Sequence, residues 1–121
     1  MGPVSGFDIA EAIRRLNAEN RDEERRIVER RRSALEEAQR LAAVMRAKEP
    51  GISAIYGFGS TFDGSRPYRM DSDIDLAIEG GDLVRLLSIV EDSEFKVDLV
   101  DIAGADDGFA RAIRAGGTRL Y

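Results

Sequence analysis

The chain has 121 residues and a formal net charge of −5, and it contains neither cysteine nor histidine. Such a length forms one domain, and the missing residue types exclude disulfides, thiolate or imidazole metal ligands and a histidine general base. Chemistry must therefore come from carboxylates, hydroxyls, lysine, arginine and backbone amides, which favours hard cations such as Mg²⁺. With no apolar run near the roughly 20 residues of a membrane span and no secretory signal, we expect a cytoplasmic protein without membrane contact.

The charge is unevenly distributed along the chain. Residues 1–50 carry eleven lysines and arginines and ten acidic residues, whereas residues 51–121 carry seven and thirteen. An acidic domain is poorly suited to following a nucleic-acid backbone, and the arginines of the first half are interleaved with glutamates. A nucleic-acid partner is therefore not expected.

Residues 1–51 are predicted to form an N-terminal helical segment. After a potential N-cap at Asp8, apolar residues recur at helical spacing, and residues 17–26 are then polar on every side. The apolar period returns at Ile27, Ala34, Leu35, Ala38, Leu41, Ala42 and Met45. Pro50 and Gly51 end the helix.

The two apolar stretches of this segment have different predicted roles. The second is expected to cover a sheet of the same chain, because a fold of about 70 residues buries little surface alone. The first, at Ile9, Ile13 and Leu16, lies too far along a straight helix to share that core. We predict that it folds back as an αα-hairpin or contacts another chain, which would give a homo-oligomer through the N-terminal helices; the remaining alternative is a solvated tail.

Residues 52–121 are predicted to form the core of the domain. Strands are expected at residues 52–56, 72–79, 95–102 and 118–121, and helices at residues 82–90 and 107–115. Pairs of glycines end the second strand and the last helix. This order indicates an α/β or α+β fold, with a small mixed sheet and helices on one face.

Two acidic residues fall on one face of the strand at residues 72–79. Successive side chains of a strand alternate, so Asp73 and Asp75 project together, opposite Ile74. Like charges this close repel in a poorly solvated site, and a divalent cation is a usual way to keep both ionised. Asp98 on the next strand adds a third acid, and three carboxylates on adjacent strands can hold two divalent ions. Asp101 is interpreted as structural or exposed.

The Gly59-Ser60 turn precedes these acids by about a dozen residues. Its backbone amides and hydroxyl are suited to holding phosphate oxygens, and glycine permits close approach. The loop that follows contains Arg66 and Arg69, which are candidates for contact with a nucleotide, and Ser65 and Ser72 are interpreted as turn residues.

These motifs resemble a known family. The Gly-Ser pair, the Ser-Asp-Ile-Asp-Leu run at residues 72–76 and the Val-Asp-Leu-Val run at residues 97–100 are similar to the signature of the DNA polymerase β-like nucleotidyltransferase superfamily. The resemblance is specifically to its minimal nucleotidyltransferase (MNT) branch, and it covers residues 52–121. It implies a nucleotidyltransferase-type sheet, with ATP as substrate and two Mg²⁺ ions.

The resemblance also implies roles for individual residues. Asp73 and Asp75 would bind the nucleotide-associated metal ions, and Asp98 would be the third acid, which assists the attacking hydroxyl. Gly59 and Ser60 would hold the triphosphate. In the MNT branch the resemblance further implies a HEPN-type partner in a toxin–antitoxin system, in which the MNT protein transfers AMP from ATP to a tyrosine of the toxin.

Three departures from the family pattern keep alternatives open. Asp63 stands where an arginine commonly follows the Gly-Ser pair, the loop to Asp73 is about two residues longer, and the preceding helical segment is longer. Arg66 or Arg69 is the candidate to replace the missing arginine. One alternative is an antitoxin that neutralises its partner by binding alone. A small-molecule transferase, for example for an antibiotic, is disfavoured because the sequence shows no following helical domain that would form an acceptor pocket.

Overall fold

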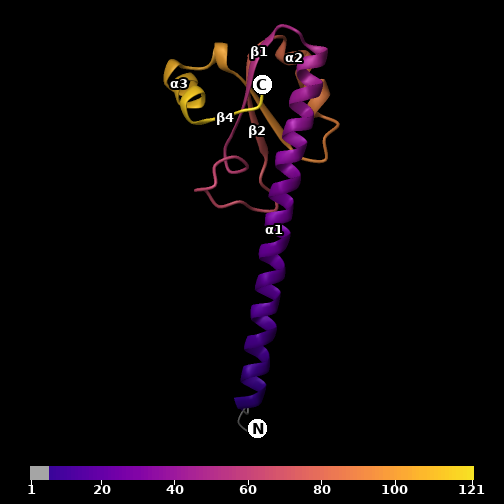
Figure 1. Cartoon of the computed structure of the whole chain (residues 1–121), viewed down its shortest axis with the longest axis vertical. Coiled ribbons are helices and arrows are strands. Elements are labelled where there is room, and N and C mark those ends of the chain that lie inside the picture. The colour runs from indigo at the N-terminus through magenta and orange to yellow at the C-terminus, as the bar shows by residue number, and fades with distance from the viewer. Residues whose placement is uncertain (1–5) are drawn as a thin grey trace.

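The computed structural model describes residues 6–121, so the first five residues of the expected helical segment lie outside it. Figure 1 shows a long helix beside a small domain of strands and helices. Its elements are α1 (Gly6–Lys48), β1 (Ile52–Phe58), β2 (Ile74–Gly80), α2 (Leu83–Val90), β3 (Val97–Asp101), the 3₁₀-helix η1 (Ile102–Gly104), α3 (Asp107–Gly116) and β4 (Thr118–Arg119).

α1 is one continuous helix of 43 residues. The predicted αα-hairpin is therefore wrong, and Asp8 lies in the first turn rather than at the N-cap. The polar stretch continues the helix because alanine, glutamate and arginine favour it and because opposite charges meet on successive turns. Arg25 lies 2.6 Å from Asp22, for example. No helix within residues 6–121 is long and apolar enough to cross a membrane.

The four strands form one mixed sheet in the order β3-β2-β1-β4. β1 runs antiparallel to both β2 and β4, whereas β2 and β3 are parallel. The expected mixed sheet after a long helix is thus confirmed. β2 begins at Ile74, so Asp73 immediately precedes the strand instead of lying within it.

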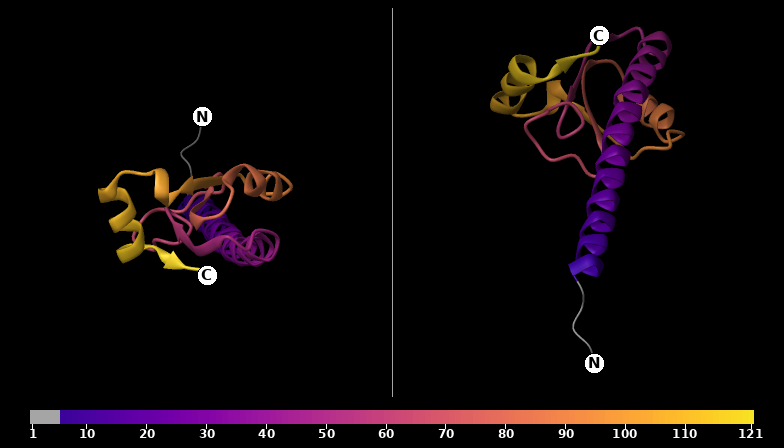
Figure 2. Two further views of the ribbon diagram at one scale, coloured as in Figure 1. Left: turned by 90° about the horizontal axis from the view of Figure 1, so that it is seen from above. Right: turned by 60° about the horizontal axis from the view of Figure 1, so that its bottom comes forward.

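α1 and α2 cover one face of the sheet. The stripe of α1 from Ala34 to Met45 is buried against Ile55, Ile74 and Leu76, which confirms that it packs on the sheet of its own chain. α3 adds a layer on the other face, beyond the one-sided arrangement expected from the sequence. A second cluster forms there, from Ala54, Tyr56, Ala77, Ile102, Ala110 and Ile113. Figure 2 shows α3 on the far side of the strands from α1.

Three aspartates begin the short helices. The side chains of Asp82 and Asp106 accept hydrogen bonds from the amides of Val84 and Phe109 at the starts of α2 and α3. Asp101 does the same for η1, where its Oδ1 lies 3.0 Å from the amide nitrogen of Ala103. Such caps satisfy amides that a helix leaves unpaired. Asp101 is therefore structural, as its interpretation from the sequence required.

Candidate active site

Three acidic residues meet at one end of the sheet. Asp75 of β2 is the register partner of Asp98 of β3, and Asp73 immediately precedes β2. Ile74 and Leu76 are buried against the helices of the first face, so the side chain of Asp75 points to the other face. The carboxyl end of β1 lies at the same level, because Phe58 pairs with Asp75.

The pKa of the Asp75 carboxyl is raised above its ordinary value. Partial burial is the largest cause, followed by the charges of Asp98 and Asp73, while the charge of Arg66 opposes the shift. Asp73 has a cation beside it, since Lys96 Nζ lies 3.6 Å from its Oδ2. Because the charges of Asp98 and Asp73 act on Asp75, these three acids are close enough to repel one another.

The residues at this end were expected to hold two metal ions. No group of three acidic side chains in residues 6–121 is already arranged to hold a metal ion, so the expected site at Asp73, Asp75 and Asp98 is not preformed. The chemistry of the donors nevertheless suits a hard cation, because carboxylate oxygens are what Mg²⁺ prefers. A cation would also relieve the repulsion that raises the pKa of Asp75.

Gly59 lies against the Asp75 side chain. Its φ is +75°, and a Cβ at this position would overlap the Asp75 carboxylate. Only glycine satisfies both requirements without strain. The Gly59 carbonyl accepts hydrogen bonds from the amides of Phe62 at 3.1 Å and Asp63 at 2.9 Å, which closes a tight turn around the partly buried Ser60. The turn expected to hold phosphate thus lies directly against the Asp75 side chain.

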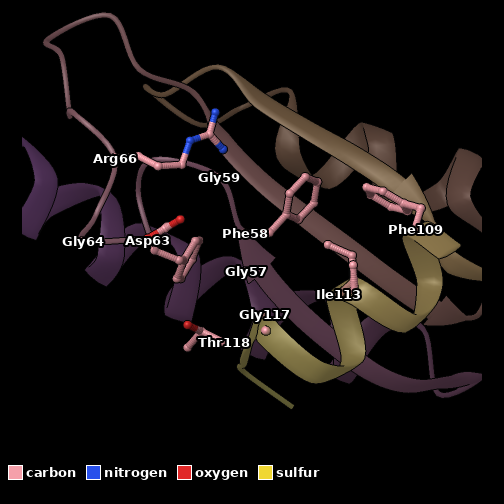
Figure 3. Close-up of a pocket in the computed structure, with 13 residues that line it drawn as sticks. Gly57, Phe58, Gly59, Asp63, Gly64, Arg66, Phe109, Ile113, Gly117 and Thr118 are labelled. Atoms are coloured by element: carbon pink, nitrogen blue, oxygen red, sulfur yellow. The ribbon is translucent and has the colours of Figure 1, made fainter.

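A pocket of about 480 Å³ opens beside this turn. Figure 3 shows its walls, which come from the end of β1, the loop at residues 62–66 and α3. The rings of Phe58 and Phe109 meet edge to face, with centroids 5.7 Å apart. Arg66 lines the same pocket, and its charge also acts on Asp75. The acids adjoin the pocket rather than line it, and Gly59 and Arg66 connect the two.

Arg66, Arg69 and Asp63 have different positions relative to the pocket. Arg69 does not line the pocket; its amide donates to Ser72 Oγ at 2.9 Å and closes a turn. Asp63 lines the pocket and accepts hydrogen bonds from the hydroxyl and the amide of Ser65, which lower its pKa. The structure therefore brings Arg66 to the site and leaves Arg69 outside it. Ser65 and Ser72 are turn residues, as predicted.

Sequence reasoning missed Thr61, which connects three parts of the site. Its side chain is fully buried, and its Oγ1 donates to the carbonyl of Asp73 at 2.9 Å. Its own carbonyl accepts from Arg31 Nε of α1 at 3.0 Å. The signal available in the sequence was its place directly after Gly59-Ser60. Lys96 was missed because its position beside Asp73 follows only from the parallel pairing of β2 and β3.

Comparison with known proteins finds similarity at the level of structure. No protein-family model and no curated protein sequence matches the chain. A crystal structure of a toxin–antitoxin with AMP-PNP is 26% identical, with a TM-score of 0.54 over 66% of this chain and 68% of that chain. A mutant of the MntA–HepT toxin–antitoxin is 25% identical, with a TM-score of 0.53 over 68% and 70%. The fold is of the minimal nucleotidyltransferase type.

A third structure, of the MntA–HepT toxin–antitoxin itself, supports only the fold, which is of the minimal nucleotidyltransferase type. It is 24% identical, with a TM-score of 0.50 over 68% of this chain and 67% of that chain. The mutant named above carries glutamate in place of two aspartates that are two positions apart. Asp73 and Asp75 have the same spacing. The resemblance to the MNT branch inferred from the sequence is thus confirmed.

Proposed function

We propose that this chain is a metal-dependent nucleotidyltransferase that transfers AMP from ATP to a hydroxyl. The acceptor is proposed to be a tyrosine of a HEPN-type toxin, which the transfer neutralises. The observation that carries this proposal is the contact of the Gly59 turn with Asp75, beside Asp98 in register. Two similar structures support it, because one contains AMP-PNP, an ATP analogue, and the other alters an aspartate pair of the same spacing.

The reaction assigns a task to each part of the site. The acceptor oxygen attacks the α-phosphorus of ATP, the bond from that phosphorus to pyrophosphate breaks, and Asp98 takes the hydroxyl proton. Asp73, Asp75 and Asp98 would hold Mg²⁺, which when bound supplies positive charge to the phosphates and the attacking oxygen. The amides that follow Gly59 and the guanidinium of Arg66 would bind phosphate oxygens.

The pocket beside Gly59 suits the nucleoside part of the substrate. Its volume of about 480 Å³ lies within the range of about 300–1,000 Å³ that ligand pockets commonly have. Phe58 and Phe109 provide an apolar wall for a base, and Arg66, whose charge also acts on Asp75, lines the same pocket. We therefore place the nucleoside in the pocket and the phosphates at Gly59.

The test uses ATP, Mg²⁺ and, as the candidate toxin, the product of the open reading frame next to this chain's gene. ATP labelled at the α-phosphorus should label the toxin, whereas ATP labelled at the γ-phosphorus should not, because pyrophosphate leaves. Asp73→Asn/Asp75→Asn should reduce labelling by about 10²-fold or more. The exposed acids Asp71 and Asp92 lie outside the site, so Asp71→Asn and Asp92→Asn are matched controls. Absence of label with the unaltered chain would reject the transferase.

A second candidate function is neutralisation by binding alone. One observation favours it: Asp63 lines the pocket at the place where the family pattern has an arginine. In cells that express the toxin, such a protein should protect equally well with Asp73→Asn/Asp75→Asn. Loss of protection in that variant, with binding to the toxin intact, would exclude this function.

A further inference from the structure

α1 carries an apolar stripe on one side, which the polar residues 17–26 interrupt. The part from Ala34 to Met45 is buried against the sheet. Ile9 lies 36 positions before Met45, which is ten turns at 3.6 residues per turn, so both residues are on the same side of the helix. Ile13 and Leu16 lie within about 40° of that line. These three residues therefore lie on the same side as the buried stripe, beyond the polar residues 17–26, and Ile9, Ile13 and Leu16 are 49%, 53% and 57% exposed.

The exposed part of the stripe projects past the end of the sheet that carries the acids. Arg31 marks the level of the loop after β1, because it donates to the carbonyl of Thr61. Residues 8–27, here called the arm, precede this level and are about 30 Å long at 1.5 Å per residue. Figure 1 shows the arm extending beyond the loop that joins β1 to β2. The arm thus stands on the catalytic side of the domain.

A second copy of the chain fits this stripe poorly. In a parallel pair of α1 helices the two domains would clash. From Ala34 onward the stripe of each helix is already covered by the sheet of its own chain. In an antiparallel pair, Ile9, Ile13 and Leu16 of each chain would bury on the order of 300 Å² per chain. Stable interfaces bury about 1,200–2,000 Å² in total. A partner that contacts both the arm and the adjoining end of the domain can reach that area.

The chemistry of the arm selects an apolar partner rather than a polyanion. It carries five arginines and six acidic residues, and two of the arginines are paired within the helix, Arg14 with Glu11 and Arg25 with Asp22. Exposed pairs of this kind leave little net charge for binding phosphates. The uncharged surface that remains is the stripe, and its spacing matches the apolar face of another helix.

We infer that the arm is the docking surface for the protein acceptor, which binds through an amphipathic helix laid along Ile9, Ile13 and Leu16. This inference rests on the proposed function. Packed helices lie about 8–10 Å apart, so a helix on the arm continues the layer that the sheet forms farther along α1. It therefore ends beside the strand ends that carry Asp75 and Asp98. The arm favours a protein acceptor, because a free small molecule in the pocket would gain no binding energy from contact with the arm.

The test uses the full chain with Ile13→Glu/Leu16→Glu. Glutamate keeps helix propensity while it removes the apolar surface. Val28→Glu is the matched control, because Val28 is 65% exposed in the same helix but lies about 100° from the line through Ile9 and Met45. Mass in solution, affinity for the same candidate toxin, and KM for that toxin and for ATP are measured. Circular dichroism checks that the helix persists.

We expect the unaltered chain to be a monomer in the absence of the toxin. Ile13→Glu/Leu16→Glu should weaken toxin binding and raise KM for the toxin tenfold or more, with KM for ATP unchanged, and Val28→Glu should match the unaltered chain. Equal toxin affinity in all three proteins would overturn the docking surface, as would a dimer that Ile13→Glu/Leu16→Glu dissociates. A toxin that binds through the arm without being labelled contradicts the transferase alone, and a labelled toxin with unchanged KM contradicts the docking surface alone.

Discussion

Asp75 and Asp98 are register partners across the parallel strands β2 and β3. Burial and the charges of Asp98 and Asp73 raise the pKa of Asp75. Holding these acids close together opposes folding when they are ionised, and the charge of Arg66 offsets only part of that cost at Asp75. Such an arrangement is typical of sites where a ligand provides the positive charge.

Asp75→Asn is expected to raise the melting temperature at neutral pH. A raised pKa means that the folded chain holds the proton more tightly than the unfolded chain. Ionised Asp75 therefore destabilises the fold above its folded pKa, and this penalty disappears as the pH falls through that value. The advantage of asparagine should shrink accordingly in thermal denaturation from about pH 7 to about pH 4. An equal gain from Asp71→Asn, at an exposed position, would contradict this cause.

Mg²⁺ is expected to raise the melting temperature of the unaltered chain. A ligand that binds only the folded state at 100 times its Kd adds about 2.7 kcal/mol. The effect should be lost in Asp73→Asn/Asp75→Asn, because the donor oxygens are replaced. KCl at matched ionic strength controls for screening. Equal stabilisation of both proteins by Mg²⁺ would place the ion elsewhere.

Gly59→Ala is expected to destabilise the fold and disturb the acids. Its left-handed conformation costs a residue with a Cβ about 1–2 kcal/mol, and the added methyl also displaces the Asp75 carboxylate. In an Asp75→Ala background only the first cost should remain, so the two substitutions should be non-additive in urea denaturation. Gly64→Ala in the same loop meets nothing closer than 3.9 Å and should change stability by less than about 1 kcal/mol. Additive effects at Gly59 and Asp75 would refute the contact.

Thr61→Val is expected to cost about 1–3 kcal/mol, because the carbonyl of Asp73 loses its donor in a buried place. The two side chains have nearly the same shape, so packing is preserved. Ser53→Ala is the matched control, since its hydroxyl donates to the carbonyl of Glu79 at 3.1 Å in an exposed position where water can replace it. Chemical denaturation measures both. Equal losses would show that burial is not the cause.

Glu37→Gln is expected to lower stability at neutral pH and to have no effect in acid. The hydrogen bond from Arg40, helped by that from Ser93 at 2.6 Å, lowers the pKa of Glu37. A lowered pKa stabilises the fold above the ordinary glutamate value, and this contribution is lost as the pH falls through the folded pKa. Urea midpoints at about pH 7 and about pH 3 test this. Glu36→Gln, on the exposed side of α1, should show no such convergence.

The sequence by itself determined the local elements and the identity of the three acids. Residues from Ala34 to Met45 recur at helical spacing, which is sufficient to predict the stripe that packs on the sheet. The alternation around Ile74 likewise predicts that Asp75 faces away from the core. Both conclusions need only the geometry of a single helix or strand, so they hold before the fold is known.

Only the tertiary structure decided how these pieces meet. Nothing in the sequence of the loop distinguishes Arg66 from Arg69; the turn at Gly59 and the bond of Thr61 to Asp73 direct one of them to the pocket and leave the other outside. The sequence also did not decide whether α1 is one straight helix, because a polar stretch can either form a turn or continue the helix. It continues because contact with the sheet from Ala34 onward anchors the helix and overcomes the cost of nucleation, after which ion pairs between turns suffice to extend it.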